Sequence, residues 1–126
     1  MTRYVTVAHV IRIHALVIAK FGGSLGIRDQ GALEGAVARP QTGYYADLTQ
    51  EAAALWESLS QNHPFIDGNK SIAMTGAFLK ANGYRLEFDD LAACSFLVGL
   101  YESGQMEFRK LETWLRQHAV LIRPAN

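Results

Sequence analysis

The chain has 126 residues, a length that fits one folded domain with a substantial hydrophobic core. Apolar residues make up 49% of it and charged residues 19%, the balance of a globular protein that folds without external cross-links. Twelve basic and twelve acidic residues cancel. Direct binding to nucleic acid or to an anionic membrane requires an excess of positive charge, so we expect neither.

The cysteine count and the hydropathy pattern bear on the location of the protein. The single cysteine, Cys94, excludes an internal disulfide. The sequence contains no apolar run long enough to span a membrane and no basic-then-apolar leader with a cleavage site. We therefore expect a cytoplasmic protein.

The first predicted helix covers residues 7–20. Thr6 is suited to cap it, and Gly22 with the next glycine ends it. Helical spacing predicts an inward stripe of Val7, Ile11, His14, Ile18 and Phe21. His9 and His14 lie five residues apart, a poor spacing for sharing a helical face, so we expect structural or surface roles for both.

Two more helices are predicted before the central motif. Asp29 is suited to cap a helix at residues 30–39, which Pro40 ends, and its inward residues are Leu33, Ala36 and Val37. A connection at residues 41–48 contains a glycine and two tyrosines. A helix at residues 49–62 follows, with Ala52, Leu55, Trp56 and Leu59 on one face.

The second half of the chain also reads as helical. A helix at residues 71–82 is rich in small side chains, and Asn82-Gly83 ends it. Residues 84–88 form a short connector, and a nearly all-apolar helix is predicted at 91–102. A last helix begins near Glu107 and reaches His118 or beyond, with Phe108, Leu111, Trp114 and Leu115 on one stripe.

These periodicities predict a fold class. Long stretches of period 3.6 are separated by short glycine or proline breaks, and no convincing alternating strand is visible. We expect a single all-α domain over residues 1–126, with about six helices around the one at residues 69–82.

Residues 63–70 form the candidate catalytic motif. Their sequence is His63-Pro64-Phe65-Ile66-Asp67-Gly68-Asn69-Lys70. This tight loop is predicted to lead directly into a helix N-terminus, where unpaired amides and the helix dipole favour an anion. Lys70 opposes that dipole, which indicates that it binds a ligand. Asp67 beside phosphates is suited to hold Mg²⁺, and the imidazole of His63 is suited to act as a general base. The alternative is an ordinary helix–helix connection capped by Asn69 or Asp67.

At these residues the chain resembles the Fic/Doc (filamentation and death-on-curing) family. HPFIDGNKS is similar to the signature of the death-on-curing branch, roughly H-P-F-x-D-G-N-K-R. Further similarity is carried upstream by Phe21-Gly22-Gly23, Gly26-Ile27-Arg28-Asp29 and Ala38-Arg39-Pro40-Gln41. The chain departs from the signature at Ser71, where the family has arginine.

The resemblance implies the fold of that family and a toxin of a toxin–antitoxin module. Its expected activity is Mg²⁺-dependent transfer of phosphate from ATP, or another nucleoside triphosphate, to a protein hydroxyl. His63 would be the catalytic base, Asp67 the metal ligand, and Gly68, Asn69, Lys70 and Ser71 the phosphate-binding residues. The residues at 41–48 would flank the active site and help to align the protein substrate.

The residues of the motif leave two alternatives to phosphate transfer open. AMP-transferring Fic proteins carry glycine, then arginine, then a second arginine three positions later, where this chain has Lys70, Ser71 and Met74. The lysine would crowd the channel for the terminal phosphates, which favours phosphate transfer. Because serine cannot replace the bidentate charge of arginine, a weakened enzyme or an inactive antitoxin-binding module is the other alternative.

The resemblance also implies partners. An antitoxin with a disordered C-terminal segment would fold into a helix on the toxin, which calls for an exposed apolar groove. The expected protein substrate is a translation factor such as elongation factor Tu. This choice comes from the resemblance alone.

Overall fold

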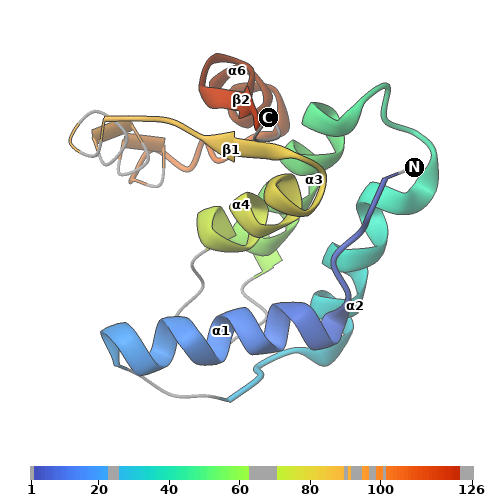
Figure 1. Ribbon diagram of the computed structural model, residues 1–126. Coiled ribbons are helices and arrows are strands. Elements are labelled where there is room, and N and C mark those ends of the chain that lie inside the picture. The colour runs from blue at the N-terminus through green and yellow to red at the C-terminus, as the bar shows by residue number, and fades with distance from the viewer. Residues whose placement is uncertain are drawn as a thin grey trace.

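The computed structural model describes residues 2–22, 26–62, 71–89, 91, 95–96, 99–100 and 102–122. This part of the chain is mostly helical, with one small two-stranded sheet, as Figure 1 shows. The elements are, in chain order, α1 (Val7–Phe21), α2 (Gln30–Ala38), the 3₁₀-helix η1 (Arg39–Thr42), α3 (Leu48–Asn62), α4 (Ser71–Ala81), β1 (Tyr84–Leu86), α6 (Phe108–His118) and β2 (Ala119–Leu121). Residues 91, 95–96, 99–100 and 102 are also helical. The predicted all-α fold class is confirmed.

The first two helices begin at the caps that the sequence predicts. The Thr6 hydroxyl accepts a hydrogen bond from the His9 amide at 3.1 Å, and the Asp29 carboxylate accepts one from the Ala32 amide at 2.9 Å. These bonds satisfy amides that have no partner inside the helix. Helix α1 ends at Gly22, whose φ of 85° suits glycine.

The inward face of α1 differs from the predicted stripe in one respect. Val10, His14 and Ile18 are buried, whereas Ile11 is 38% exposed. Ile11 follows Val10 by one residue and therefore lies about 100° around the helix from it. The prediction that Ile11 faces the core was wrong.

In the part of the chain that the structure describes, α3 lies at the centre of the bundle, whereas the sequence predicted the helix at residues 69–82 there. Helix α3 contacts α2, η1, α4 and α6. Its residues 51–56 are buried on all sides, because three consecutive alanines there let neighbouring helices approach closely. Helix α4 buries Phe78 and Leu79 but exposes Lys80 and Ala81, so it has one outward side.

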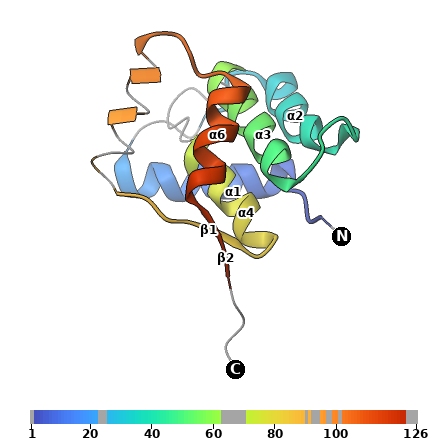
Figure 2. The same cartoon turned by 90° about the horizontal axis from the view of Figure 1, so that it is seen from above.

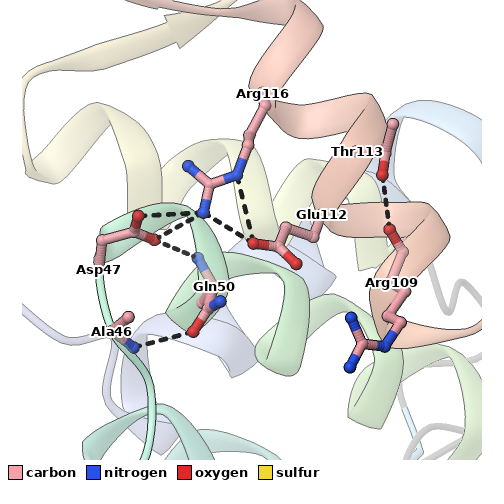
Figure 3. Close-up of polar contacts among 7 residues, drawn as sticks. All are labelled: Ala46, Asp47, Gln50, Arg109, Glu112, Thr113 and Arg116. Atoms are coloured by element: carbon pink, nitrogen blue, oxygen red, sulfur yellow. Dashed lines mark hydrogen bonds and ion pairs between the residues drawn. The ribbon is translucent and has the colours of Figure 1, made fainter.

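The N-terminus of α3 is held by a polar network, shown in Figure 3. Asp47 accepts a hydrogen bond from the Gln50 amide at 3.0 Å, while the Gln50 side chain accepts one from the Ala46 amide at 2.8 Å. Arg116 of α6 pairs with Asp47 at 3.0 Å and with Glu112 at 2.7 Å. Partial burial would raise the pKa of Asp47, but the Gln50 amide and Arg116 outweigh it and lower that pKa.

Helix α6 packs against α3, and Figure 2 shows it in front of that helix. Its buried stripe consists of Leu111, Trp114 and Leu115, as predicted, and the rings of Trp114 and Trp56 meet edge to face at 5.4 Å. His118, the last residue of α6, stacks on Trp114 at 4.2 Å. The predicted structural role of His118 is compatible with this contact and stays a prediction.

A short antiparallel sheet corrects the prediction that the chain contains no strand. Strand β1 pairs with β2 in the register Tyr84↔Leu121, Arg85↔Val120 and Leu86↔Ala119. Gly83, with φ of 87°, turns the chain from α4 into β1. The residues predicted to be a plain connector therefore tie the end of α4 to the end of α6.

The described core forms a single hydrophobic cluster. It extends in sequence from Val5 to Leu115 and draws on α1, α2, α3, α4 and α6. In the part of the chain that the structure describes, no helix is both long and apolar enough to cross a membrane.

Candidate active site

The predicted catalytic motif connects the central helix to α4. His63, Asp67, Gly68, Asn69 and Lys70 lie outside the described residues, so their side-chain geometry stays a prediction. The two anchor points are described, because α3 ends at Asn62 and α4 begins at Ser71. The two helices pack against each other, and the eight residues of the motif join their ends.

The described part of α4 begins directly after the predicted motif in the sequence. Ser71 is its first residue, and Lys70 is the preceding residue of the chain. The amides of a first helical turn lack intrahelical partners, and the helix dipole adds a partial positive charge there. The first turn of α4 carries no acidic residue that would compete for these groups. The backbone at this point is therefore suited to hold a phosphate group.

The helices that carry the motif are fixed by the core. On α3 the last buried positions before the motif are Ser58 and Leu59, and on α4 Thr75, Phe78 and Leu79 are buried. A site supported by buried helices on both sides can hold its reacting groups at defined positions.

Helix α1 crosses the bundle on the side where α3 ends and α4 begins, as Figure 1 shows. Its inward face carries a buried imidazole, His14. The outward His9 is exposed. Their different environments agree with the prediction that the two histidines do not act as a pair.

Residues 41–48, expected to flank the active site, are tied to the side of α3. Arg39 donates from Nε to the Tyr45 hydroxyl at 2.6 Å, and its Nη1 contacts Glu57 and Ser58 at 2.7 and 2.9 Å. Glu57 lies five residues before Asn62, about 7.5 Å along the helix axis. Through Arg39, the Tyr45 hydroxyl is therefore linked to the half of α3 that leads to the motif.

The same contacts perturb the ionisation of Arg39. Partial burial would lower its pKa, but hydrogen bonds to Glu57 and Tyr45 outweigh burial and raise it. Arg39 therefore stays charged and holds the loop in place. The neighbouring Tyr44 is 85% exposed and packs edge to face on Tyr45.

Asp67 is the one residue that the sequence predicts as a ligand of Mg²⁺. Among the described residues, no group of three or more His, Cys, Asp or Glu side chains could hold a metal ion. A single carboxylate completed by phosphate oxygens is the usual donor set for a nucleotide-bound Mg²⁺. The chemistry of Asp67 fits that role.

A basic hollow lies between the N-terminal segment, α1 and α4. Its volume is about 330 Å³, and it is lined by Arg3, Tyr4, Val5, His9, Arg12, Ile13, Ala77 and Ala81. Two hydrogen bonds of 2.7 Å between the Asn82 side chain and the backbone of Arg3 fix one wall. Within the described chain, the side chains of Arg3 and Arg12 form no ion pair.

Sequence reasoning did not identify this hollow, although the sequence contains a signal for it. Neither α1 nor α4 contains an acidic residue, while together they carry Arg12, Lys20 and Lys80. A chain with no net charge therefore concentrates positive charge on the face made by these two helices. Leu16, on the same stripe of α1 as Arg12 and Ile13, is 65% exposed.

Comparisons with known proteins show the family of this chain. The model of the Fic/DOC family matches residues 4–79, which include α1 to α3, the motif and most of α4. "Toxin Doc" of Mycolicibacterium smegmatis is 42% identical over 96 residues, covering 71% of this chain and 72% of that protein. "Protein kinase doc" of Escherichia phage P1 is 27% identical over 121 residues, covering 91% and 94% of the two chains. The chain therefore belongs to the Fic/DOC family, in its death-on-curing branch.

Proposed function

We propose that the protein is the toxin of a toxin–antitoxin module and transfers phosphate from a nucleoside triphosphate to a hydroxyl group of another protein. The observation that best supports the proposal is that residues 63–70 join the end of α3 at Asn62 to the start of α4 at Ser71, and these two helices pack against each other. Two relatives support the proposal by name, one a toxin and one a protein kinase.

The proposed chemistry assigns one task to each group. His63 accepts the proton of the attacking hydroxyl, whose oxygen forms the new bond to the γ-phosphorus while the bond to the leaving nucleoside diphosphate breaks. Residues 68–71 and the Lys70 ammonium hold the phosphates. Asp67 would hold Mg²⁺, which neutralises negative charge on the phosphate oxygens when it is bound. Positioning and charge stabilisation supply most of the rate in such reactions.

The substrate is expected to be a translation factor such as elongation factor Tu, which would place the reaction in the cytoplasm. The exposed Tyr44 and the loop that Arg39 fixes beside α3 form a surface on which that substrate can be aligned. The balanced charge of the chain favours a protein target over a nucleic acid or a membrane surface.

Two other functions compete with this one. AMP transfer by the same residues is disfavoured by Lys70, as argued from the motif. An inactive antitoxin-binding module is favoured by Ser71, because loss of one preorganised charge donor commonly costs about two to three orders of magnitude in rate.

The deciding experiment uses ATP labelled at either the γ or the α phosphate. The protein, Mg²⁺ and a cell lysate are incubated with each label, with His63→Ala as the matched control. Transfer of the γ label only, abolished in His63→Ala, supports phosphotransfer. Transfer of the α label identifies AMP transfer instead. If neither label is transferred, the binding-module function is favoured.

The antitoxin is proposed to cover the basic face of α1 and α4. An acidic amphipathic helix would place carboxylates against Arg3 and Arg12 and apolar side chains against the hollow and Leu16. Because a disordered segment folds as it binds, its affinity depends strongly on such complementary contacts.

Charge reversal on this face tests the location. Arg3→Glu with Arg12→Glu is expected to weaken binding of the C-terminal antitoxin peptide by at least about tenfold in calorimetry, and the matched Arg85→Glu to leave it unchanged. Arg85 is a fair control because it is exposed and is not among the residues that line this hollow. Equal affinity in all three proteins would place the antitoxin elsewhere.

A further inference from the structure

A second and larger hollow lies along α6. Its volume is about 480 Å³, and it is lined by Asp89, Phe96, Arg109, Lys110, Thr113, Trp114, Gln117 and His118. Helix α6 is at the top of Figure 1, whereas α1, which borders the basic hollow, is at the bottom. A volume of this size is within the range of small-molecule sites, roughly 300–1,000 Å³.

The apolar wall of this hollow is already formed in the free protein. Trp114 contacts two further rings, with His118 stacked at 4.2 Å and Phe96 stacked at 6.1 Å. The His118 Nδ1 atom donates to the Trp114 carbonyl at 2.7 Å, which fixes the imidazole. Trp56 of α3 supports the indole from the core at 5.4 Å. A ligand would not have to order these side chains, so little binding energy would be lost to ordering.

The rim of the hollow provides a positive charge that is free to bind. The guanidinium of Arg109 makes no hydrogen bond or ion pair with any residue that the structure describes, and Figure 3 shows only its backbone carbonyl engaged, by the Thr113 hydroxyl at 2.9 Å. Lys110 donates to Gln105, which holds a second cation at the rim. Asp89 is the one acidic group among the described residues that line the hollow.

We propose that this hollow binds a small, mostly apolar molecule that carries one anionic group. The apolar part would occupy the space beside Trp114 and Phe96, and the anion would meet the Arg109 guanidinium at the rim. Arginine suits this role because its planar donors can bind a carboxylate or sulfonate in two places. The inference does not depend on the proposed phosphotransfer, because no residue of the motif takes part.

Two matched fluorescent probes test the proposal on the full-length protein. 1-Anilinonaphthalene-8-sulfonate is an apolar anion, and N-phenyl-1-naphthylamine is the same ring system without the sulfonate. We expect both to bind at a single saturable site and the anionic probe to bind about tenfold more tightly, the effect of one charge-assisted hydrogen bond. Equal affinity for the two probes would overturn the anionic part of the proposal.

Three variants locate the site. Arg109 is exposed. Arg109→Ala is expected to weaken binding of the anionic probe about tenfold and to leave the affinity for the neutral probe unchanged. Thr113→Trp fills the hollow and is expected to abolish binding of both probes, with circular dichroism confirming that the variant is folded. Arg3→Ala, in the basic hollow, is expected to change neither affinity. Loss of binding in Arg3→Ala, or unaltered binding in Arg109→Ala, would overturn the assignment.

Nuclear magnetic resonance gives a second readout that does not depend on a variant. The chain contains two tryptophans, of which Trp114 lines the hollow and Trp56 does not. Addition of the anionic probe is expected to shift the indole signal of Trp114 more than that of Trp56. A larger shift of the Trp56 signal would contradict the proposed site.

Discussion

Glu57 of α3 accepts a hydrogen bond from the backbone amide of Phe108, the first residue of α6, at 2.6 Å. Glu107, at the N-cap position of α6, makes no capping bond of its own. The central helix therefore caps its neighbour, and the other carboxylate oxygen of Glu57 pairs with Arg39 at 2.7 Å. One side chain thus joins α6, α3 and the segment that follows α2.

Removal of this carboxylate is expected to destabilise the protein. Glu57→Ala loses both contacts and leaves Arg39 without its ion pair, which should lower the free energy of unfolding by about 2 kcal/mol, typical of hydrogen bonds to charged groups. Glu57→Gln keeps an acceptor for the Phe108 amide and should lose less. Urea denaturation measures both. An equal loss in the two variants would show that the cap on α6 contributes nothing.

Asp47 should stabilise the protein in two separable ways. Asp47→Ala removes the N-cap of α3 and the pair with Arg116, and should lower the free energy of unfolding by about 1 kcal/mol. Asp47→Asn keeps the cap and loses only the charge, so at neutral pH it should cost less, because an exposed ion pair contributes little.

The charge of Asp47 also predicts a pH dependence. Its pKa is lowered in the folded state, so its ionised form stabilises the fold above the unfolded pKa of 3.8, and this contribution disappears as the pH falls through the folded value. The stability difference between the wild-type protein and Asp47→Asn should therefore shrink in acid. A difference that grows below pH 4 would contradict this assignment.

Restoration of arginine at Ser71 is expected to raise the rate of phosphotransfer by about a hundredfold, because a bidentate, permanent charge returns to the phosphate site. Ser71→Lys is the matched control, and a smaller gain is expected since lysine is a point charge without the fork geometry. The rate of γ-label transfer measures both variants. An arginine variant that transfers the label no faster than the serine protein would exclude this position as a limit on the proposed phosphotransfer.

The ionisation of Tyr4 predicts that the stability of the protein also changes at alkaline pH. Its hydroxyl donates to the buried Glu51, and this hydrogen bond, together with burial and the negative charge of Glu51, raises the pKa of Tyr4 above 10.0. A raised tyrosine pKa stabilises the fold below the unfolded pKa and loses that effect as the pH rises through the folded value. Tyr4→Phe should therefore cost about 1–2 kcal/mol at pH 8 and less above pH 10. Thermal unfolding at both pH values measures the difference, and a constant cost would refute the role of ionisation.

The parts of the fold that local chemistry determines could be predicted from the sequence. Thr6 and Asp29 cap helices because their side chains reach amides three residues on, and Gly22 and Gly83 end helices because they adopt positive φ. The helix predicted after the motif is present as α4, which begins at Ser71.

Features that depend on distant packing could not be predicted. Strands β1 and β2 contain three residues each, too few to show an alternating pattern, and their pairing joins segments more than thirty positions apart. The small residues of α4 were read as a sign of full burial. The alanines of α3 proved to be the ones surrounded on all sides, because α6 covers α3 through Trp114.

The position of α6 over α3 has a consequence for the synthesis of this protein. The family model ends at residue 79, but the core also requires Leu111, Trp114 and Leu115. A recombinant fragment cut at the edge of the family match would leave the apolar surface of its own middle helix open to water and to aggregation. On the ribosome, the core cannot close before the segment from 108 to 115 has emerged, so the nascent chain would remain unfolded until that segment is available.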